Sequence, residues 1–276
     1  MTATISSLIT DEQVRQYHEL GYCVVDALFT PEEIEDIKEF FEDYKINGAK
    51  MFDTGSGTAA FKYDEIDPKE RQVRAMHPHR YSEKALGWFL NPKVAEVLEI
   101  LLGKPALGAQ TMYYYKPPGA RGQGMHQDNF YLLSKPATCI AAWTSIDGAD
   151  LDNGCLWVVP KSNLAGILCP EEGKARWNDY GDSHITKFPR DEKPVPVLVP
   201  RGSTMFFGGD TIHGSGPNRT PDRFRRTFIG HYVDEASEQL AGFYHPVINM
   251  QGEVVSDIQK PQGGGPCSDG WQGAVH

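Results

Sequence analysis

Cysteine is scarce in this chain, and its cysteines form no local pairs. The five cysteines are widely spaced, without a C-x-x-C motif: Cys23, Cys139, Cys155, Cys169 and Cys267. An odd number of scattered cysteines disfavours both a disulfide framework and a zinc–thiolate site. We therefore expect free thiols and a reducing compartment, the cytoplasm.

Long apolar runs and an excess of positive charge are also missing. No apolar stretch reaches the roughly 18 residues of a membrane-spanning helix. The N-terminal segment MTATISSLITDEQ has no basic region followed by a long apolar run, so it does not resemble a secretory signal. The net charge of −10 repels the phosphates of nucleic acids and of anionic lipids. We expect a small-molecule substrate as the partner, with no nucleic acid and no membrane. The sequence indicates no oligomeric state.

Helix signals are concentrated in the first third of the chain. A capping pattern at Thr10 begins one predicted helix, which ends at Gly21. Thr30-Pro31 begins a second helix and Pro92 a third. The segment 45–85 between the second and third helices has no regular pattern and is predicted to be a long loop.

Short strands separated by turn residues follow from about residue 105. The candidates are Leu107–Tyr115, Met125–Leu132, Cys139–Ile146, Cys155–Val159, Val195–Val199, Ser203–Phe207 and Arg225–Val233. This spacing is typical of a β-sandwich or barrel. Strands do not alternate with helices here, which disfavours a doubly wound parallel sheet. We expect a fold that is mainly β with flanking helices.

The segment GMHQDNF carries a possible metal site. On the predicted strand Met125–Leu132, His126 and Asp128 point to the same face because side chains alternate. A third ligand must come from elsewhere, and His213 in GGDTIHGSGPN is the strongest candidate. Two histidines and one carboxylate form the ligand set of non-haem Fe(II) oxygenases. An isolated H-x-D is more often a surface or turn pair, so the later histidine decides the interpretation.

An arginine follows His213 at the start of a predicted strand. The guanidinium of Arg225 suits bidentate binding of a carboxylate, as a keto-acid cosubstrate with a second carboxylate requires. Arg223 and Arg226 compete for this role. Strand alternation places Arg225 and Arg226 on opposite faces, so only one of these two points inward.

Taken together, these motifs resemble the phytanoyl-CoA dioxygenase (PhyH) family of Fe(II)/2-oxoglutarate-dependent oxygenases. The resembling segments are EQVRQYHELGYCVVDALFTPEEI, YYYKPPG, MHQDNFYL, AAWTSID, DNGCLWVVPKSN and HGSGPNRTPDRFRRTFIGHY. The resemblance implies a double-stranded β-helix core, a cupin-like jelly roll, at about 105–235. Because no interdomain linker is visible, we expect a single domain over 1–276, with a helical N-terminal part over 1–104 and a mobile tail at about 255–276.

The resemblance also implies the site residues. It makes His126, Asp128 and His213 the catalytic iron ligands. It makes Arg225 the partner of the distal carboxylate of 2-oxoglutarate and Ser215 a hydroxyl donor to it. Met112 and Trp143 match positions that line the cosubstrate pocket.

The implied activity is a cytoplasmic Fe(II)- and 2-oxoglutarate-dependent dioxygenase. It would use O2 to oxidise a C–H bond of a small molecule or natural product of secondary metabolism, releasing succinate and CO2. A carboxylate at position 128 favours hydroxylation, with desaturation, epoxidation and ring formation as alternatives. Two other functions stay open: a metal-dependent, cupin-like isomerase or hydrolase without O2 chemistry, and a non-catalytic metal or 2-oxoglutarate sensor. A cluster of basic residues lies in the predicted loop 45–85, and we expect it to be solvated rather than to bind an anion. Its members are Arg74, His77, His79 and Arg80.

Overall fold

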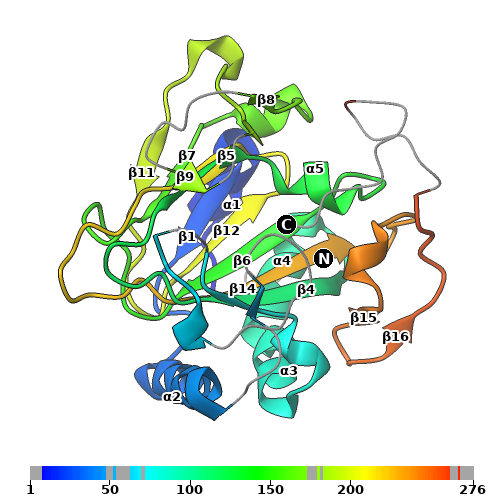
Figure 1. Ribbon diagram of the computed structural model, residues 1–276. Helices are drawn as coiled ribbons and strands as arrows, with labels where there is room; N and C mark the ends of the chain where they lie inside the picture. Colours follow the sequence, from blue (N-terminus) through cyan, green and yellow to red (C-terminus); the bar gives the residue numbers. More distant parts are fainter. Residues whose placement is uncertain are drawn as a thin grey trace.

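Two β-sheets face each other in the computed structural model, which describes residues 8–47, 52–53, 63–69, 72–172, 179–180, 183–261 and 267 (Figure 1). The larger sheet runs in the order β1 (Tyr22–Val25), β12 (Thr204–Gly208), β6 (Ile140–Ser145), β14 (Thr227–Asp234), β4 (Ala106–Tyr114), β15 (Val247–Asn249) and β16 (Val254–Val255). Beside β4 lie β3 (Arg74–Met76) and then β2 (Phe52–Asp53). The smaller sheet runs in the order β11 (Val195–Val197), β7 (Leu156–Val158), β13 (His213–Ser215), β5 (Gly122–His126) and β9 (Asp179–Tyr180). A separate strand pair joins β8 (Glu171–Glu172) to β10 (Ser183–His184).

The predicted fold class, mainly β with a jelly-roll core, is confirmed by this arrangement. Most expected strands appear within a residue or two of their predicted bounds. One prediction is wrong in part: Met125–Leu132 is not a continuous strand, because β5 ends at His126 and a short helix begins at Asp128. Another strand, β13, was not expected, because its three residues lie in a turn-rich stretch.

In the part of the chain that the structure describes, five α-helices accompany the sheets: α1 (Asp11–Leu20), α2 (Pro31–Asn47), α3 (Glu83–Phe89), α4 (Pro92–Leu102) and α5 (Asp128–Leu132). The start of α1 has the predicted capping box between Thr10 and Gln13, and Gly21 ends the helix with φ 90°. The start of α2 has the same reciprocal bonds, between Thr30 and Glu33. These local signals explain why the helix ends were readable from sequence.

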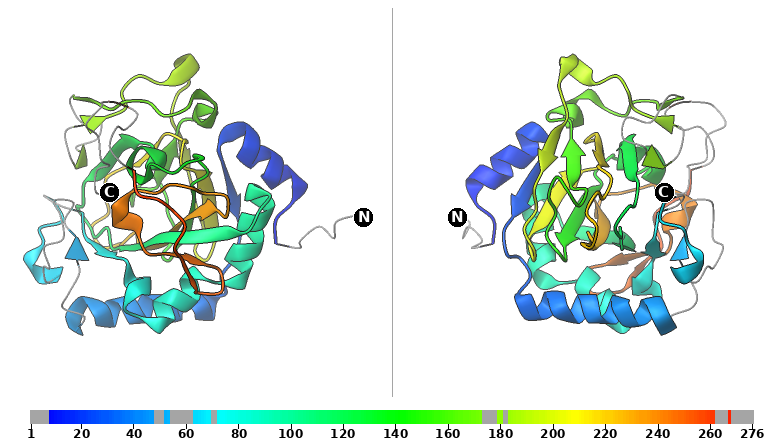
Figure 2. Two further views of the ribbon diagram at one scale, coloured as in Figure 1. Left: turned by 90° about the vertical axis from the view of Figure 1, so that its right-hand side faces the viewer. Right: turned by 60° about the vertical axis from the view of Figure 1, so that its left-hand side comes forward.

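The core is divided by the larger sheet. On its outer face, apolar side chains of α2 and α4 pack against strand residues such as Tyr113 and Phe206. Figure 2 shows α2 lying along this side of the molecule, below the sheets. On the inner face, Met112 and Trp143 pack with Leu156 and Val158 of the smaller sheet. Burial of both faces explains why nearly every residue of β4, β6 and β14 is buried.

The segment 45–85 is more ordered than the sequence indicated. It contains β3, which pairs with β4, and the first residues of α3. The expectation of a solvated loop is wrong for Arg74, His77 and His79, which are buried, whereas Arg80 is exposed. With only three residues, β3 is too short to show a clear strand pattern in the sequence.

A disulfide joins Cys169 to Cys267, across 98 positions of sequence. The expectation of free thiols throughout is therefore wrong for this pair, although Cys23, Cys139 and Cys155 are free and buried. Spacing along the chain gave no sign of the pairing because tertiary structure alone brings the two residues together. Within the described ranges, no helix has the length and apolar character needed to cross a membrane.

Candidate metal centre and adjoining pocket

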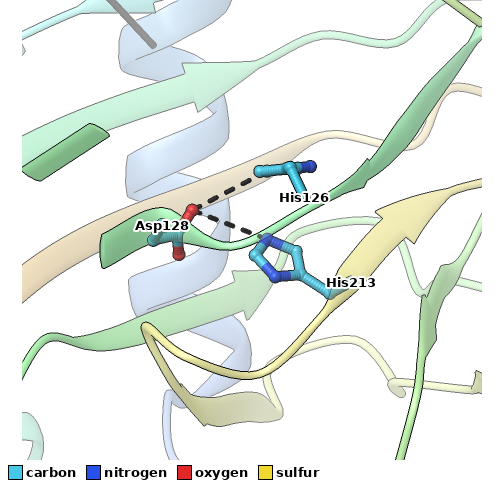
Figure 3. A group of neighbouring side chains, drawn as sticks. All are labelled: His126, Asp128 and His213. Carbon is cyan, nitrogen blue, oxygen red and sulfur yellow. Dashed lines mark ion pairs between the residues drawn. The ribbon is translucent and has the colours of Figure 1, made fainter. Parts of the chain in front are cut away.

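Three predicted ligands converge where β5, α5 and β13 meet. His126 is the last residue of β5, Asp128 the first of α5 and His213 the first of β13. The Nε2 atoms of His126 and His213 lie 3.7 and 3.6 Å from Oδ1 of Asp128. One donor atom from each residue lies within 4.8 Å of the others, and all three residues are buried. Figure 3 shows the side chains pointing toward one another from their separate elements.

Backbone carbonyls orient both imidazoles. Nδ1 of His126 lies 2.8 Å from the carbonyl oxygen of Gly124, and Nδ1 of His213 lies 2.9 Å from that of Thr211. A carbonyl only accepts, so each Nδ1 carries a hydrogen, and in a neutral ring the lone pair is then on Nε2, the nitrogen that faces Asp128. This is the tautomer that metal-ligating histidines adopt when the second ring nitrogen is held by the protein.

The second oxygen of Asp128 has its own partner. Oδ2 accepts a hydrogen bond of 3.2 Å from Nε2 of His231, a buried residue on β14. In the sequence, strand alternation places His231 on the same face as Arg225, and this pattern alone favours an ordinary core histidine. The structure instead places His231 behind the carboxylate, where it fixes the orientation of Oδ1 toward the histidines.

The donor set fits a ferrous ion. Two neutral imidazole nitrogens and one carboxylate oxygen, gathered from one side, are the ligands of non-haem iron oxygenases. Tetrathiolate zinc sites need cysteines, and none belongs to this group. Within the described residues this is the one cluster of three or more histidine, cysteine or acidic side chains with metal-binding geometry.

Both residues predicted to bind the distal carboxylate line one pocket. Its described lining residues are Gln72, Val73, Tyr114, Lys116, Ala120, Arg121, Gln123, Ser215 and Arg225. Ser215 belongs to β13, the strand that begins with His213. The metal cluster and the pocket therefore share a strand.

The three competing arginines occupy different environments. Arg223 is exposed and pairs with Asp150 at 2.5 Å. Arg226 donates to Asp147 and to Glu42 of α2. Only Arg225 is buried in the pocket, with 4% of its surface exposed. Arg225 and Arg226 point in different directions, as expected, although β14 begins only at Thr227.

Neighbouring groups hold the Arg225 guanidinium in place. Its Nε donates to the carbonyl of Gly154 at 3.2 Å, and Nη1 donates to Oγ1 of Thr227 at 3.3 Å. The guanidinium carbon lies 5.3 Å from the ring centroid of Trp143, within cation–π range. Trp143 packs with Met112 on the inner face of the larger sheet.

Buried polar groups also lie on the inner face near Asp128. Gln110 is opposite His231 in the β4–β14 register, and the His77 backbone N–H donates to the carbonyl of Thr111. The ring nitrogens of His77 and the side-chain amide of Gln110 have no hydrogen-bond partner among the described residues. Burial lowers the pKa of His77 to about 2, and nearby Arg80 adds to the effect, so the ring is neutral.

The sequence offers four aromatic residues that could shape a substrate pocket, Phe61, Trp88, Tyr131 and Trp177, and the two that the structure describes have different surroundings. Trp88 packs on the outer face against Phe40, away from the metal cluster. The ring of Tyr131 lies edge-on to that of His126, 6.0 Å between centroids. Phe61 and Trp177 lie outside the described residues.

Comparison with known proteins shows which family this chain belongs to. The sequence profile of the phytanoyl-CoA dioxygenase (PhyH) family matches residues 17–227. This chain belongs to the phytanoyl-CoA dioxygenase family. Peroxisomal phytanoyl-CoA dioxygenase from Rattus norvegicus is 26% identical over 273 residues, covering 94% of this chain and 78% of that protein. A probable phytanoyl-CoA dioxygenase from Caenorhabditis elegans is 27% identical over 243 residues, covering 83% and 77%.

Solved structures support the family fold. EctD from S. alaskensis in its apo form has a TM-score of 0.66 at 17% identity, covering 88% of this chain and 83% of that one. The α-ketoglutarate-dependent carbocyclase SnoK from nogalamycin biosynthesis has a TM-score of 0.65 at 18% identity, covering 83% and 86%. Family membership confirms the predicted reaction class, an oxygenase dependent on Fe(II) and 2-oxoglutarate, and with it the predicted fold.

Proposed function

We propose that this PhyH-family protein hydroxylates a C–H bond of a small-molecule substrate, with Fe(II), 2-oxoglutarate and O2. The observation that carries the proposal is the placement of a buried arginine pocket beside a buried His–Asp–His cluster on one strand. Bound iron and 2-oxoglutarate would supply the oxidising power, with O2 as oxidant and with succinate and CO2 as products. The protein contributes binding, orientation and exclusion of water.

Each site residue has a separate task in this proposal. His126, Asp128 and His213 hold the metal. Arg225 and Ser215 bind the distal carboxylate of 2-oxoglutarate, a charge-assisted interaction of the strong class. The remaining predicted pocket residues, Met112 and Trp143, form an apolar wall that keeps water from the reacting groups. His231 donates to Asp128 and keeps one carboxylate oxygen directed at the metal position.

The buried polar groups near Asp128 support a substrate that offers an uncharged hydrogen-bonding group. A buried polar atom without a partner costs roughly 1–3 kcal/mol, so His77 and Gln110 would gain from a hydroxyl, carbonyl or amide. Replacing Gln110 with Leu is expected to lower turnover of the true substrate. The affinity for 2-oxoglutarate, measured without substrate, should stay unchanged. A loss of 2-oxoglutarate binding would place Gln110 on the cosubstrate side instead.

The proposed substrate is a natural product of secondary metabolism rather than an acyl-CoA, because no acyl-CoA signature stands out in the sequence. Two of the similar solved structures, SnoK and the epimerase SnoN, are enzymes of nogalamycin biosynthesis. Hydroxylation is favoured over halogenation because related halogenases have a small residue at the position of the carboxylate ligand, where this chain has Asp128. A cupin-like isomerase or hydrolase has no use for the Arg225 pocket.

The experiment is a screen of natural-product substrates read out as succinate formation. Asp128→Ala, which removes one metal ligand, is the matched inactive control. A substrate that raises succinate formation in the wild type only, with an added oxygen in its mass, supports hydroxylation. Turnover of a substrate without O2 or 2-oxoglutarate would contradict the proposal.

A cytoplasmic location is part of the proposal and is supported by the three free, buried cysteines, Cys23, Cys139 and Cys155. The Cys169–Cys267 disulfide weighs against it, because disulfides persist mainly in oxidising compartments. Peptide mapping distinguishes a reduced from an oxidised Cys169–Cys267 pair. The protein is treated with a thiol-blocking reagent in its native cells and is then mapped without reduction. An oxidised pair there would overturn the cytoplasmic assignment.

A further inference from the structure

A lysine that the sequence did not single out reaches into the same pocket. Lys116 follows β4 and adopts a left-handed backbone conformation, with φ 31°. Only 7% of its surface is exposed. Its Nζ lies 3.0 Å from Oγ of Ser215. A long basic side chain is seldom buried to this degree without a functional or structural partner.

The direction of that hydrogen bond is fixed by chemistry. An ammonium group only donates, so Oγ of Ser215 is the acceptor. The hydroxyl hydrogen of Ser215 is then directed away from Lys116 and stays available as a donor. Lys116 therefore orients Ser215 as a hydrogen-bond donor, which is the role that a ligand carboxylate requires.

Backbone contacts hold Lys116 beside Arg225. The Arg225 N–H donates to the Lys116 carbonyl at 3.1 Å, and Nδ2 of Asn218 donates to the same oxygen at 3.1 Å. Gly154 leaves space for the lysine stem, because a Cβ at that position would lie 2.7 Å from Cε of Lys116 and 2.5 Å from the carbonyl oxygen of Gly216. The two cations are thus held as a unit by the fold.

The described lining of the pocket carries positive charge. Among its described lining residues, Lys116, Arg121 and Arg225 are basic and none is acidic. Burial raises the pKa of the nearby Cys155 thiol to about 11; the charges of Arg225 and Lys116 oppose that rise, whereas Asp150 adds to it. Both cations therefore act on the same small region, and a site with this charge attracts an anion.

We propose that Lys116 is a second cation of the cosubstrate anchor and selects keto acids that carry a distal carboxylate. This inference rests on the proposed function, because it assumes that 2-oxoglutarate occupies the Arg225 pocket. Arg225 offers the planar fork, while Lys116 adds a second positive charge and orients the Ser215 hydroxyl. A keto acid without the second carboxylate gains nothing from either cation.

The test compares 2-oxoglutarate with 2-oxopentanoate, a keto acid of the same chain length that lacks the distal carboxylate. Affinities are measured anaerobically with Fe(II)-loaded wild type and Lys116→Met. We expect the substitution to weaken 2-oxoglutarate binding on the order of 10- to 100-fold, the range for losing a hydrogen bond to a charged group. Binding of 2-oxopentanoate should stay within about twofold, since a charge-assisted bond is lost only for the dicarboxylate.

Two further variants keep the test decisive. Lys116→Gln covers the case in which the methionine variant fails to fold, and Ser215→Ala should cost less in the Lys116→Met background than in the wild type, because the two residues act together. Equal weakening of both keto acids would assign Lys116 a structural role only. Unchanged 2-oxoglutarate affinity would overturn the inference. Wild-type protein that binds no 2-oxoglutarate would instead overturn the proposed function.

Discussion

His213 lies directly opposite His126 in the antiparallel ladder between β13 and β5. Their ring centroids are 4.3 Å apart, although the two residues are distant in sequence. Asp128 joins them because the intervening Gln127 is extended, with φ −124° and ψ 131°. A slip of one residue in this ladder would turn the His213 imidazole to the other face of the sheet, away from His126. The geometry of the metal site therefore depends on the register of this one strand pair.

Removal of a ligand should abolish tight Fe(II) binding. We expect Asp128→Ala and His213→Ala to weaken Fe(II) affinity by more than ~100-fold, since even loss of an outer partner costs up to about that factor. Anaerobic calorimetry measures this directly. His18→Ala, which changes an exposed histidine of α1, is the control. Equal affinities for all three variants would mean that the metal binds elsewhere.

His231 should affect the metal without touching it. Its Nε2 donates to the Asp128 oxygen that faces away from the other ligands. His231→Leu is therefore expected to lower Fe(II) affinity about 10- to 100-fold, the usual effect of removing a hydrogen bond behind a ligand. His245→Gln, at a partly buried histidine that contacts the Leu240 carbonyl, is the matched control. A His231→Leu protein with wild-type affinity would show that Asp128 is positioned by its backbone alone.

Arg225 and Arg223 form a matched pair for testing the cosubstrate anchor. Arg225→Met should weaken 2-oxoglutarate binding by about 2–5 kcal/mol, the range for removing one partner of a buried charged hydrogen-bonded pair. Arg223→Met should leave that affinity unchanged, because Arg223 is exposed and pairs with Asp150. Titration of Fe(II)-loaded protein gives both values. The reverse order of effects would transfer the anchor to Arg223.

Stability should fall at mildly acidic pH because two histidines are buried. Burial lowers the pKa of His77 to about 2 and that of His79 to about 3, from 6.5. Below pH 6.5 the unfolded chain binds more protons than the folded one, so the free energy of unfolding decreases as pH falls. Each histidine contributes about 1.4 kcal/mol per pH unit in that window.

The variant His77→Phe isolates one of these contributions. Between pH 7.5 and 5.5 its metal-free form should lose about 1.4 kcal/mol less stability than the wild type, as measured by urea unfolding. His18→Phe, at an exposed position, controls for the substitution itself. Identical losses in His77→Phe and wild type would show that the His77 ring is accessible to protons in the folded state.

Much of the site was predictable because its chemistry follows local patterns. The H-x-D pair, the later histidine and the nearby arginine have distinctive spacing, and capping residues marked the helix ends. The choice among Arg223, Arg225 and Arg226 was not settled by sequence, since it depends on which neighbours are acidic in space. The assignment of one domain over the whole chain stays a prediction.

Other features had no signal in the sequence. Lys116 precedes two prolines in an apparent turn, and only the fold places its ammonium group beside Ser215. The pairing of Cys169 with Cys267 and the burial of His77 in a polar segment likewise depend on tertiary contacts. The helix α5 was concealed because Asp128–Leu132 is rich in aromatic residues that favour strands.

The most direct test of the central claim is a visible absorption spectrum taken under anaerobic conditions. Fe(II) and 2-oxoglutarate are added to the wild-type protein and to Asp128→Ala. We predict a weak charge-transfer band in the wild type, which requires the metal and the keto acid to bind together, and no band in the variant. A wild-type spectrum without this band, at concentrations that saturate both additions, would contradict the account.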